Sequence, residues 1–257
     1  RNLAPNLVLI SKVENSEGLR NFLDIIKQSD AIMIDRGDLA AEIGLENLYD
    51  AIETISDNTK AHGKPLVMAT ENLETMLERE VPSKSEVMSI AHSASIGVDC
   101  IMLSEETATA NSGQEIVNWL DRFLNTCTRV NRPKSSNTIT QKFPTVWNAL
   151  ASLENIPVLL MTKSGYALFE YFSVQPQGEA ILLTDNQKII KICSLFANKI
   201  TVVPTIMDGA PLERLWEIVE RNKDDFFVEA DQLATVYVSR YVHTARACLL
   251  YTSDAAD

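Results

Sequence analysis

Four short apolar runs, separated by longer stretches with helical periodicity, constrain the fold of the first half of the chain. The runs span residues 7–10, 31–34, 66–68 and 100–103. Each has the length and the aliphatic composition of a buried β-strand. Strands that alternate with helices are typical of βα units, whose strands form a parallel sheet. We therefore predict an α/β fold in which four strands end at a common edge.

The stretches between the runs carry the start and stop signals of helices. The predicted helices are one capped by Ser16, one from Leu45 to Ala61 that ends at His62-Gly63, one from Ser83 to Ile96 that ends at Gly97, and an amphipathic one from Gln114 to Val130. Each would carry the chain back so that the next strand runs parallel to the previous one.

A second, smaller α/β domain is predicted after residues 132–144. That segment, RPKSSNTITQKFP, has little apolar periodicity and is rich in Ser, Thr, Asn and Pro, so we interpret it as a linker. Beyond it we expect strands at 157–161, 180–183 and 200–203, and helices near 164–172, 186–196 and 211–221. The predicted domains therefore cover residues 1–131 and 145–247.

Charge and composition exclude several classes of function. The net charge is −12 and no basic stripe is present, which argues against nucleic-acid binding. No apolar run approaches the ~20 residues that span a bilayer. The four cysteines form no C-x-x-C pair, so we expect free thiols in a reducing cytoplasm. Since the sequence starts at Arg1 without an initiator Met, we expect the native N-terminus to lie upstream.

Polar side chains follow each predicted strand. They are Lys12 and Glu14 after the first strand, Arg36, Gly37 and Asp38 after the second, Thr70 and Glu71 after the third, and Ser104, Glu105, Glu106 and Thr107 after the fourth. In a parallel barrel the carboxyl ends of the strands open on one face, where the active site lies. The sequence thus predicts that an ammonium, several carboxylates and hydroxyls converge on one pocket.

Two readings of this cluster stay open from the residues alone. Glu14 and Asp38 are hard oxygen ligands of the kind that Mg²⁺ or Mn²⁺ prefers, and the amides of Gly37 and Asp38 could hold a substrate carboxylate. Alternatively, Lys12 and Glu14 form a simple ion pair and Asp38 caps a helix. Thr70, Ser104, Glu106 and Thr107 taken singly are equally well explained as caps or buried hydrogen-bonding groups.

Five blocks in the first half resemble pyruvate kinases in order and spacing. They are ISKVENSEGLRNF, SDAIMIDRGDLAAEIG, GKPLVMATENLETML, VPSKSE and VDCIMLSEETA. The resemblance implies a partial (β/α)8 TIM barrel made of the last four βα units, in residues 1–131, followed by the family's C-terminal α/β domain in 145–247. It also implies transfer of a phosphoryl group from phosphoenolpyruvate to ADP, giving pyruvate and ATP.

The resemblance assigns roles to individual residues. Lys12 would stabilise the phosphoryl group in flight, and Glu14 and Asp38 would hold Mg²⁺ or Mn²⁺. The amides of Gly37 and Asp38 would bind the substrate carboxylate, and Thr70 would lie by the methylene carbon that is protonated. Arg36, Ser104 and Glu106 would support these groups.

Three acids depart from the family pattern near the same rim. The usual A-R-G-D-L-G begins with Asp35 here, A-T-Q ends in Glu71, and the block around Ser104 contains Glu105. A carboxylate at Asp35 that faces phosphoenolpyruvate would weaken its binding. The Lys, Glu, Asp and Thr of the pattern are retained, so we favour catalytic ancestry.

The resemblance also implies that much of the family's architecture lies outside this chain. The first half of the barrel, which holds the K⁺ site, is not represented, so we expect the 257 residues to be inactive alone. A complete protein would be a cytoplasmic homotetramer. Residues 248–257, CLLYTSDAAD, do not resemble the family's last strands, and we expect this tail to be non-native.

The second domain contains one candidate ligand site. Thr162, Lys163, Ser164 and Gly165 follow a strand and precede a helix, and such a turn can bind a phosphate through its amides. In pyruvate kinases a T-x-S-G turn belongs to a sugar-phosphate effector site. An ordinary helix cap explains the same residues equally well.

Two other functions remain open. The first is an aldolase-like lyase that acts on pyruvate enolates with a divalent cation, which would ignore ADP. The second is a non-catalytic metabolite-binding relic, supported only by the extra acids Asp35, Glu71 and Glu105. The R-G-D-L block together with Lys12 favours the kinase.

Overall fold

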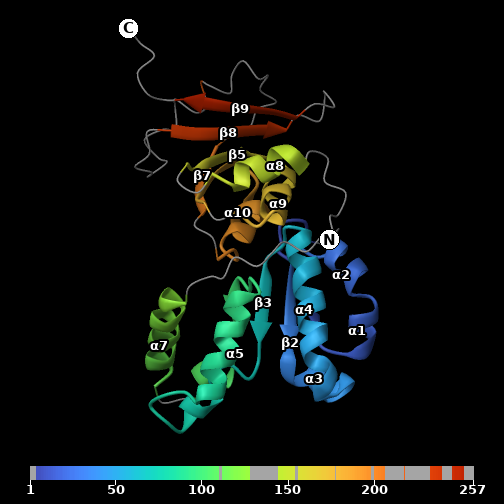
Figure 1. Cartoon of the computed structure of the whole chain (residues 1–257), viewed down its shortest axis with the longest axis vertical. Coiled ribbons are helices and arrows are strands. Elements are labelled where there is room, and N and C mark those ends of the chain that lie inside the picture. Colours follow the sequence, from blue (N-terminus) through green and yellow to red (C-terminus); the bar gives the residue numbers. More distant parts are fainter. Residues whose placement is uncertain are drawn as a thin grey trace. The chain divides into compact units, whose positions relative to one another are not determined.

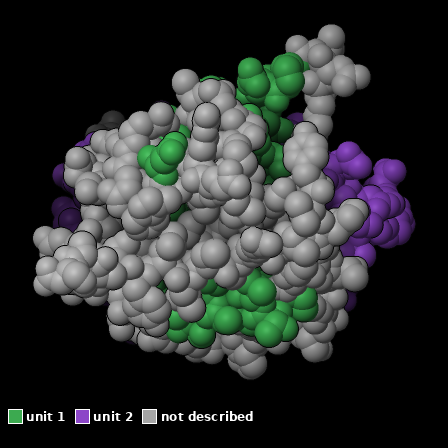
Figure 2. All heavy atoms as spheres, turned by 90° about the horizontal axis from the view of Figure 1, so that it is seen from above, with its two compact units in different colours: residues 1–8, 138–257 green, residues 9–137 purple. Residues whose placement is uncertain are grey.

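The computed structural model describes residues 4–109, 112–127, 144–153, 156–176, 178–197, 200–205 and 217, and the backbone of strands 232–238 and 245–251. The chain divides into two compact units, residues 9–137 and residues 1–8 with 138–257, which Figure 2 distinguishes by colour. Each unit is considered by itself. None of the helices in the described ranges is long and apolar enough to cross a bilayer.

The unit of residues 9–137 is built on a four-stranded parallel sheet. Its strands are β1 (Ile10–Val13), β2 (Ala31–Asp35), β3 (Leu66–Ala69) and β4 (Cys100–Ile101), in the order β1-β2-β3-β4. The register pairs Lys12 with Met33 and Asp35 with Ala69. Because neighbouring strands are parallel, their carboxyl ends lie at one edge, and the residues that follow them are brought together there.

Helices connect these strands, as the alternation in the sequence predicts (Figure 1). They are α1 (Ser16–Arg20), α2 (Phe22–Gln28), α3 (Arg36–Ile43), α4 (Leu45–Ala61), α5 (Lys84–Ser95), α6 (Glu105–Ala108) and α7 (Gly113–Thr126), with a 3₁₀ turn η1 (Glu74–Leu77). The predicted span of α4 is confirmed, and Gly63, just past its end, has the positive φ of 66° that favours glycine. Ser83 caps α5 in a capping box with Glu86.

The core of this unit lies between the sheet and the helices. Ile32 and Ile34 of β2 pack with Leu66 and Met68 of β3 and with Ile55 of α4 in one buried cluster. Burying each such side chain stabilises the fold by about 1.5–3 kcal/mol. The sheet edge is therefore a rigid support for the polar groups that follow it.

Two details of the first βα unit differ from the sequence prediction. The first strand is Ile10–Val13 rather than residues 7–10, because pairing with β2 buries Val13 and leaves Leu7 65% exposed. Apolar character alone placed the strand too early. The cap of the first helix is Asn15, whose Oδ1 accepts from the amide of Gly18 at 2.8 Å, whereas Ser16 donates to Glu42.

The second unit contains a five-stranded sheet in the order β7-β6-β5-β8-β9. Its elements are α8 (Pro144–Ala151), β5 (Val158–Met161), α9 (Tyr166–Ser173), β6 (Ala180–Thr184), α10 (Gln187–Cys193), β7 (Ile200–Pro204), β8 (Gln232–Val238) and β9 (Ala245–Tyr251). All neighbouring strands are parallel except β8 and β9. Trp147 and Tyr171 are fully buried in its core.

The predicted α/β class and the partial barrel followed by an α/β domain are confirmed. The three strands predicted in the second unit are present, with bounds shifted by at most one residue. The linker predicted at 132–144 lies outside the described residues except for Pro144, which begins α8, and residue 217 is the only described residue of the helix predicted at 211–221. The domain bounds and the non-native tail remain predictions, and strand β9 includes residues 248–251.

Candidate active site

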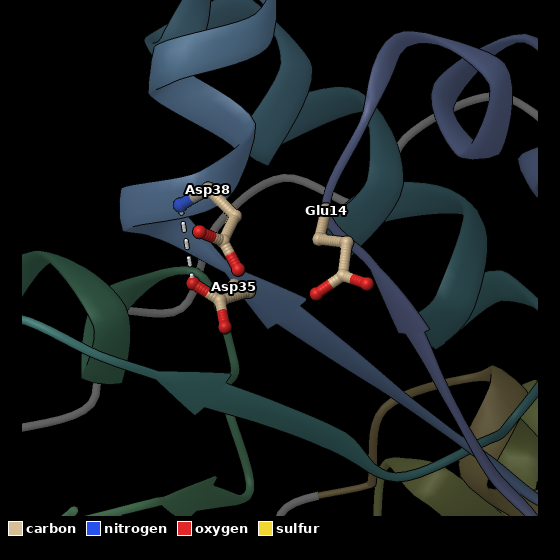
Figure 3. Close-up of side chains that lie close together, drawn as sticks. All are labelled: Glu14, Asp35 and Asp38. Carbon is tan, nitrogen blue, oxygen red and sulfur yellow. Dashed lines mark hydrogen bonds between the residues drawn. The ribbon is translucent and has the colours of Figure 1, made fainter.

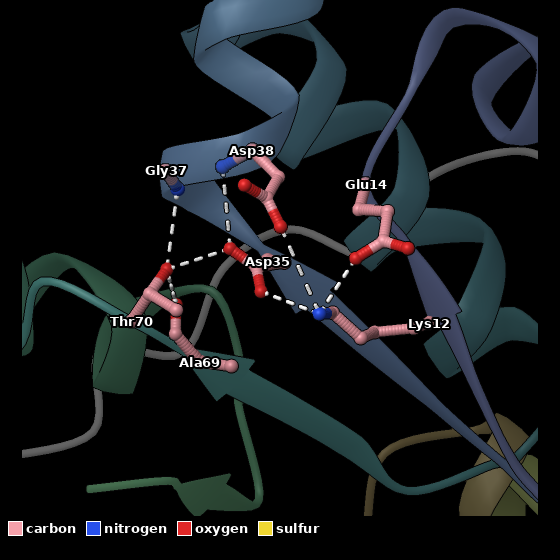
Figure 4. A network of polar contacts seen from close by, with 7 residues as sticks. All are labelled: Lys12, Glu14, Asp35, Gly37, Asp38, Ala69 and Thr70. Atoms are coloured by element: carbon pink, nitrogen blue, oxygen red, sulfur yellow. Dashed lines mark hydrogen bonds and ion pairs between the residues drawn. The ribbon is translucent and has the colours of Figure 1, made fainter. Parts of the chain in front are cut away.

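The ammonium of Lys12 lies among three carboxylates at the carboxyl ends of β1 and β2 (Figure 4). Its Nζ is 2.6 Å from Glu14 Oε2, 2.9 Å from Asp35 Oδ2 and 3.8 Å from Asp38 Oδ2. The Glu14 and Asp35 contacts hold the pKa of Lys12 above its usual value. Lys12 is therefore a permanent positive charge at this edge of the sheet.

The three carboxylates form a candidate site for a divalent cation. Oxygen atoms of Glu14, Asp35 and Asp38 lie within 4.8 Å of one another, and their side chains point toward a common point (Figure 3). Carboxylate oxygens at this spacing fit a hard cation such as Mg²⁺ or Mn²⁺. The sequence predicted Glu14 and Asp38 as ligands and treated Asp35 only as an extra charge, so the third member of the cluster was missed.

Asp35 is the most buried and most extensively bonded of these acids. Its side chain is 5% exposed, against 68% for Asp38. Oδ1 accepts from the Thr70 hydroxyl at 2.9 Å and from the Asp38 amide at 3.3 Å, which makes Asp35 the N-cap of α3. Burial raises the pKa of Asp35, but hydrogen bonds from Lys12, Thr70 and the Asp38 amide outweigh it and lower the pKa overall.

The first amides of α3 both have side-chain acceptors in the structure, and their binding of a substrate carboxylate stays a prediction. The Gly37 amide donates to Thr70 Oγ1 at 3.1 Å, and the Asp38 amide donates to Asp35. The alternative in which Asp38 caps a helix is wrong, because Asp35 caps α3. The cap and the bond of the Asp38 amide come from Asp35, one residue before the R-G-D-L block, where the family pattern has alanine.

Arg36 fixes the loop after β3. Its guanidinium donates to the carbonyls of Thr70 at 2.7 Å and Glu71 at 2.8 Å, to Asn72 Oδ1 at 2.8 Å, and to Ser89. Thr70 and Glu71 have φ values of 61° and 51°, a left-handed conformation that non-glycine residues rarely adopt. Arg36 thus holds a strained turn that aims the Thr70 hydroxyl at Asp35.

Glu106 and Asn72 join the ends of β3 and β4. Glu106 is buried, and its carboxylate accepts from the amides of Leu73 at 3.2 Å and Ser104 at 2.7 Å. Asn72, fully buried, donates to the Met102 carbonyl at 2.8 Å. Ser104 and Glu106 therefore lie beside the loop rather than in the Lys12 cluster. Sequence reasoning missed Asn72, for which the only signal is its place in the ATENLETML block.

In the second unit, the turn from Thr162 to Gly165 is stabilised by its own side chains. The Gly165 amide donates to Thr162 Oγ1 at 2.9 Å, the Tyr166 amide to Ser164 Oγ at 3.4 Å, and Asn186 bonds the Lys163 carbonyl at 2.7 Å. This is the arrangement of an ordinary helix start. The predicted phosphate-binding role of the turn stays a prediction.

Comparison with known proteins gives a consistent result. The family model described as pyruvate kinase, barrel domain, matches residues 2–117. A pyruvate kinase of Dictyostelium discoideum is 31% identical over 226 residues, which are 88% of this chain and 43% of that protein. The cytosolic pyruvate kinase isozyme of Nicotiana tabacum is 45% identical over 105 residues, covering 41% of this chain and 21% of its own length.

Solved structures agree at the level of the fold. Pyruvate kinase from Pyrobaculum aerophilum superimposes with a TM-score of 0.75 at 22% identity, over 94% of this chain and 52% of that one. A pyruvate kinase from Cryptosporidium parvum gives 0.72 at 25% identity, over 93% and 51%. The chain spans about half the length of these structures and at most about half that of the curated relatives it matches.

Parallel strands whose carboxyl ends gather a lysine and acidic residues are the arrangement of a partial barrel with a candidate active site. The family model, the curated relatives and the solved structures all indicate a pyruvate kinase.

Proposed function

We propose that this chain supplies the phosphoryl-transfer half of a pyruvate kinase active site, for the reaction of phosphoenolpyruvate with ADP to give pyruvate and ATP. The observation that carries the proposal is the position of Lys12 between Glu14 and Asp38. Phosphoryl transfer depends on positioning and on neutralising charge, and a fixed ammonium next to a cation site supplies both.

Each residue has a role that follows from its place. Lys12, held positive by its neighbours, would stabilise the phosphoryl group as it moves between two oxygens. Glu14 and Asp38 would hold Mg²⁺ or Mn²⁺, which when bound neutralises negative charge on substrate oxygens. The methylene carbon of the enolate takes up a proton as pyruvate forms, and Thr70, held by Arg36, would lie beside it.

The supporting residues would set the geometry rather than contact substrate. Arg36 holds the Thr70 turn, and Ser104 with Glu106 fixes the start of α6. Gly37 and Asp38 would offer amides to the substrate carboxylate once their present partners release them. The reaction would take place in the cytoplasm, within a homotetramer whose K⁺ site lies in the part of the barrel not represented here. The 257 residues alone would be inactive.

The direct test measures pyruvate formation by the complete protein that carries this chain, with lactate dehydrogenase as the coupling enzyme. Lys12→Met should lower kcat at least about a hundredfold, since removing one charge-stabilising donor costs 10²–10³. The matched control is Lys84→Met, which removes an exposed lysine at the start of α5 and should leave kcat unchanged.

Two results would overturn the proposal. Unchanged turnover in Lys12→Met would remove its main support. Consumption of phosphoenolpyruvate at equal rates with and without ADP would instead identify the lyase alternative. Pyruvate formation by the purified 257-residue chain would contradict the expectation that it is inactive alone.

A further inference from the structure

One acid in the site has no counterpart in the family pattern and makes more contacts than any other. Asp35 contacts the Lys12 ammonium, the Thr70 hydroxyl and the Asp38 amide at the same time. The proposed function assigns the ammonium and the amide to the substrate anion, and it places the hydroxyl beside the methylene carbon. A single buried carboxylate in the protein therefore uses all three.

We infer that Asp35 is a specificity-determining residue, which occupies the carboxylate-binding position at the start of α3 and lowers the affinity for an anionic substrate. The inference rests on the proposed function for the identity of the substrate. It adds that this chain carries an internal competitor for the substrate's carboxylate, which a substrate must displace before the Asp38 amide can bind it.

The geometry of Asp35 indicates that its carboxylate occupies the carboxylate-binding position, and that it does not act only through its charge. Its side chain is 5% exposed, so the carboxylate is held inside the site and does not swing in solvent. The Oδ1 atom accepts two hydrogen bonds, and Oδ2 receives the ammonium of Lys12 at 2.9 Å. A helix N-terminus with a charged lysine nearby favours an anion, and here the protein provides that anion itself.

The neighbouring amide strengthens the competition. Thr70 Oγ1 donates to Asp35 and accepts from the Gly37 amide at 3.1 Å, so the two hydrogen bonds form one chain through Thr70. Displacing Asp35 would remove one of the two acceptors of the Thr70 hydroxyl, the other being the Ala69 carbonyl at 2.7 Å, and would expose the Asp38 amide. Charge acts in the same direction, because Lys12 faces three carboxylates and a further anion meets net repulsion.

The test measures binding of pyruvate, which carries the carboxylate but no phosphoryl group, to the complete protein at saturating Mn²⁺ by isothermal titration calorimetry. Asp35→Ala removes the competing carboxylate and should bind pyruvate at least about tenfold more tightly, the value of one regained charge-assisted hydrogen bond. Asp35→Asn keeps an oxygen that can accept from Thr70 and Asp38 but loses the charge, so its gain should be smaller.

Two controls separate occupation from general charge. Glu105→Gln removes an exposed carboxylate on α6 and should change pyruvate affinity less than twofold. Thermal unfolding checks that each variant is folded; if Asp35→Ala is not, Asp35→Ser takes its place, since serine caps the helix with a shorter side chain.

The inference would be overturned if Asp35→Ala bound pyruvate no more tightly than the unaltered protein. It would also be overturned if Asp35→Ala and Asp35→Asn gained equally in pyruvate affinity, because the effect would then come from charge alone. Turnover of phosphoenolpyruvate with ADP, measured on the same preparations, reports separately on the proposed function. A tenfold gain in pyruvate binding without turnover would leave the inference standing and remove the kinase assignment.

Discussion

Replacing Arg36 by Met should release the loop after β3 without removing the core beneath it. Arg36 is 8% exposed, and its guanidinium bonds the carbonyls of Thr70 and Glu71 and the side chain of Asn72. Burial lowers the pKa of Arg36, and the carboxylates of Glu71, Asp35 and Glu106 oppose that shift. Methionine has a similar length but donates no hydrogen bond.

The expected loss follows from the groups left behind. Each buried polar group without a partner costs about 1–3 kcal/mol. Four oxygen acceptors are affected, those of Thr70, Glu71, Asn72 and Ser89. Thr70 and Glu71 are partly accessible and can turn toward water, which also relieves about 1–2 kcal/mol of left-handed strain per residue. The net loss is then about 3 kcal/mol. That corresponds to opening of the loop about a hundredfold more often, at roughly 1.4 kcal/mol per factor of ten.

Hydrogen exchange read by mass spectrometry measures this opening directly. Peptides that cover residues 66–74 should exchange about a hundredfold faster in Arg36→Met, while peptides that cover β5 (Val158–Met161), in the other unit, serve as the internal reference. Arg36→Lys keeps the charge but not the planar fork of donors, so its effect should be about half as large in free energy.

Exchange in residues 66–74 that changes by less than about threefold in Arg36→Met would refute this reasoning. If Arg36→Lys and Arg36→Met increased the exchange rate equally, the role given to the planar arrangement of the arginine donors would be refuted.

Two further predictions concern stability. Glu86 accepts hydrogen bonds from Thr75 and Ser83; burial raises its pKa, but these bonds outweigh it and lower the pKa below 4.5. Its contribution is therefore complete above the ordinary pKa of a glutamate and is lost as pH falls through the lower folded pKa. Glu86→Gln should cost about 1–2 kcal/mol at pH 7 by urea unfolding, and the difference should shrink as the pH is lowered into the acid range. A pH-independent difference would contradict this. Gly165 has a φ of 84°, and a Cβ at this position would lie 2.6 Å from Ile189 Cδ1. Gly165→Ala should therefore lower the free energy of unfolding by about 2–3 kcal/mol, measured by thermal unfolding. An unchanged Tm would refute this prediction.

The strands that are buried on every residue could be located from sequence with little error. β3 (Leu66–Ala69) is fully buried, so its apolar run and the strand nearly coincide. β1 contains the polar residues Ser11 and Lys12, so the strand was predicted too early, in the apolar run of residues 7–10. Periodicity locates buried residues, and it fails where a strand directs polar side chains into a site.

The convergence of the site was predictable, but its internal bonding was not. The end of each parallel strand fixes which residues meet, and Lys12, Glu14 and Asp38 do meet. The hydrogen bonds of Asp35 depend on its rotamer and on the left-handed turn at Thr70. No local pattern in the sequence predicts either of these two features. Helix α3 was missed as well, because its cap is the last residue of a strand.

The second unit shows a different limit. Strands β5, β6 and β7 follow the same alternation as the first unit and were predicted. β8 (Gln232–Val238), which pairs parallel to β5, and β9 (Ala245–Tyr251) were not predicted. β9 pairs antiparallel to β8 and so departs from the alternation of strands and helices on which the prediction relied.

The account depends most on one cation being shared by Glu14 and Asp38 beside Lys12. Electron paramagnetic resonance titration of Mn²⁺ into the complete protein tests this most directly. Glu14→Gln and Asp38→Asn should each weaken Mn²⁺ binding at least about tenfold, as loss of a carboxylate ligand does, while Glu42→Gln, an exposed carboxylate on α3, should leave it unchanged. Mn²⁺ affinity that is the same in all three variants as in the unaltered protein would contradict the account.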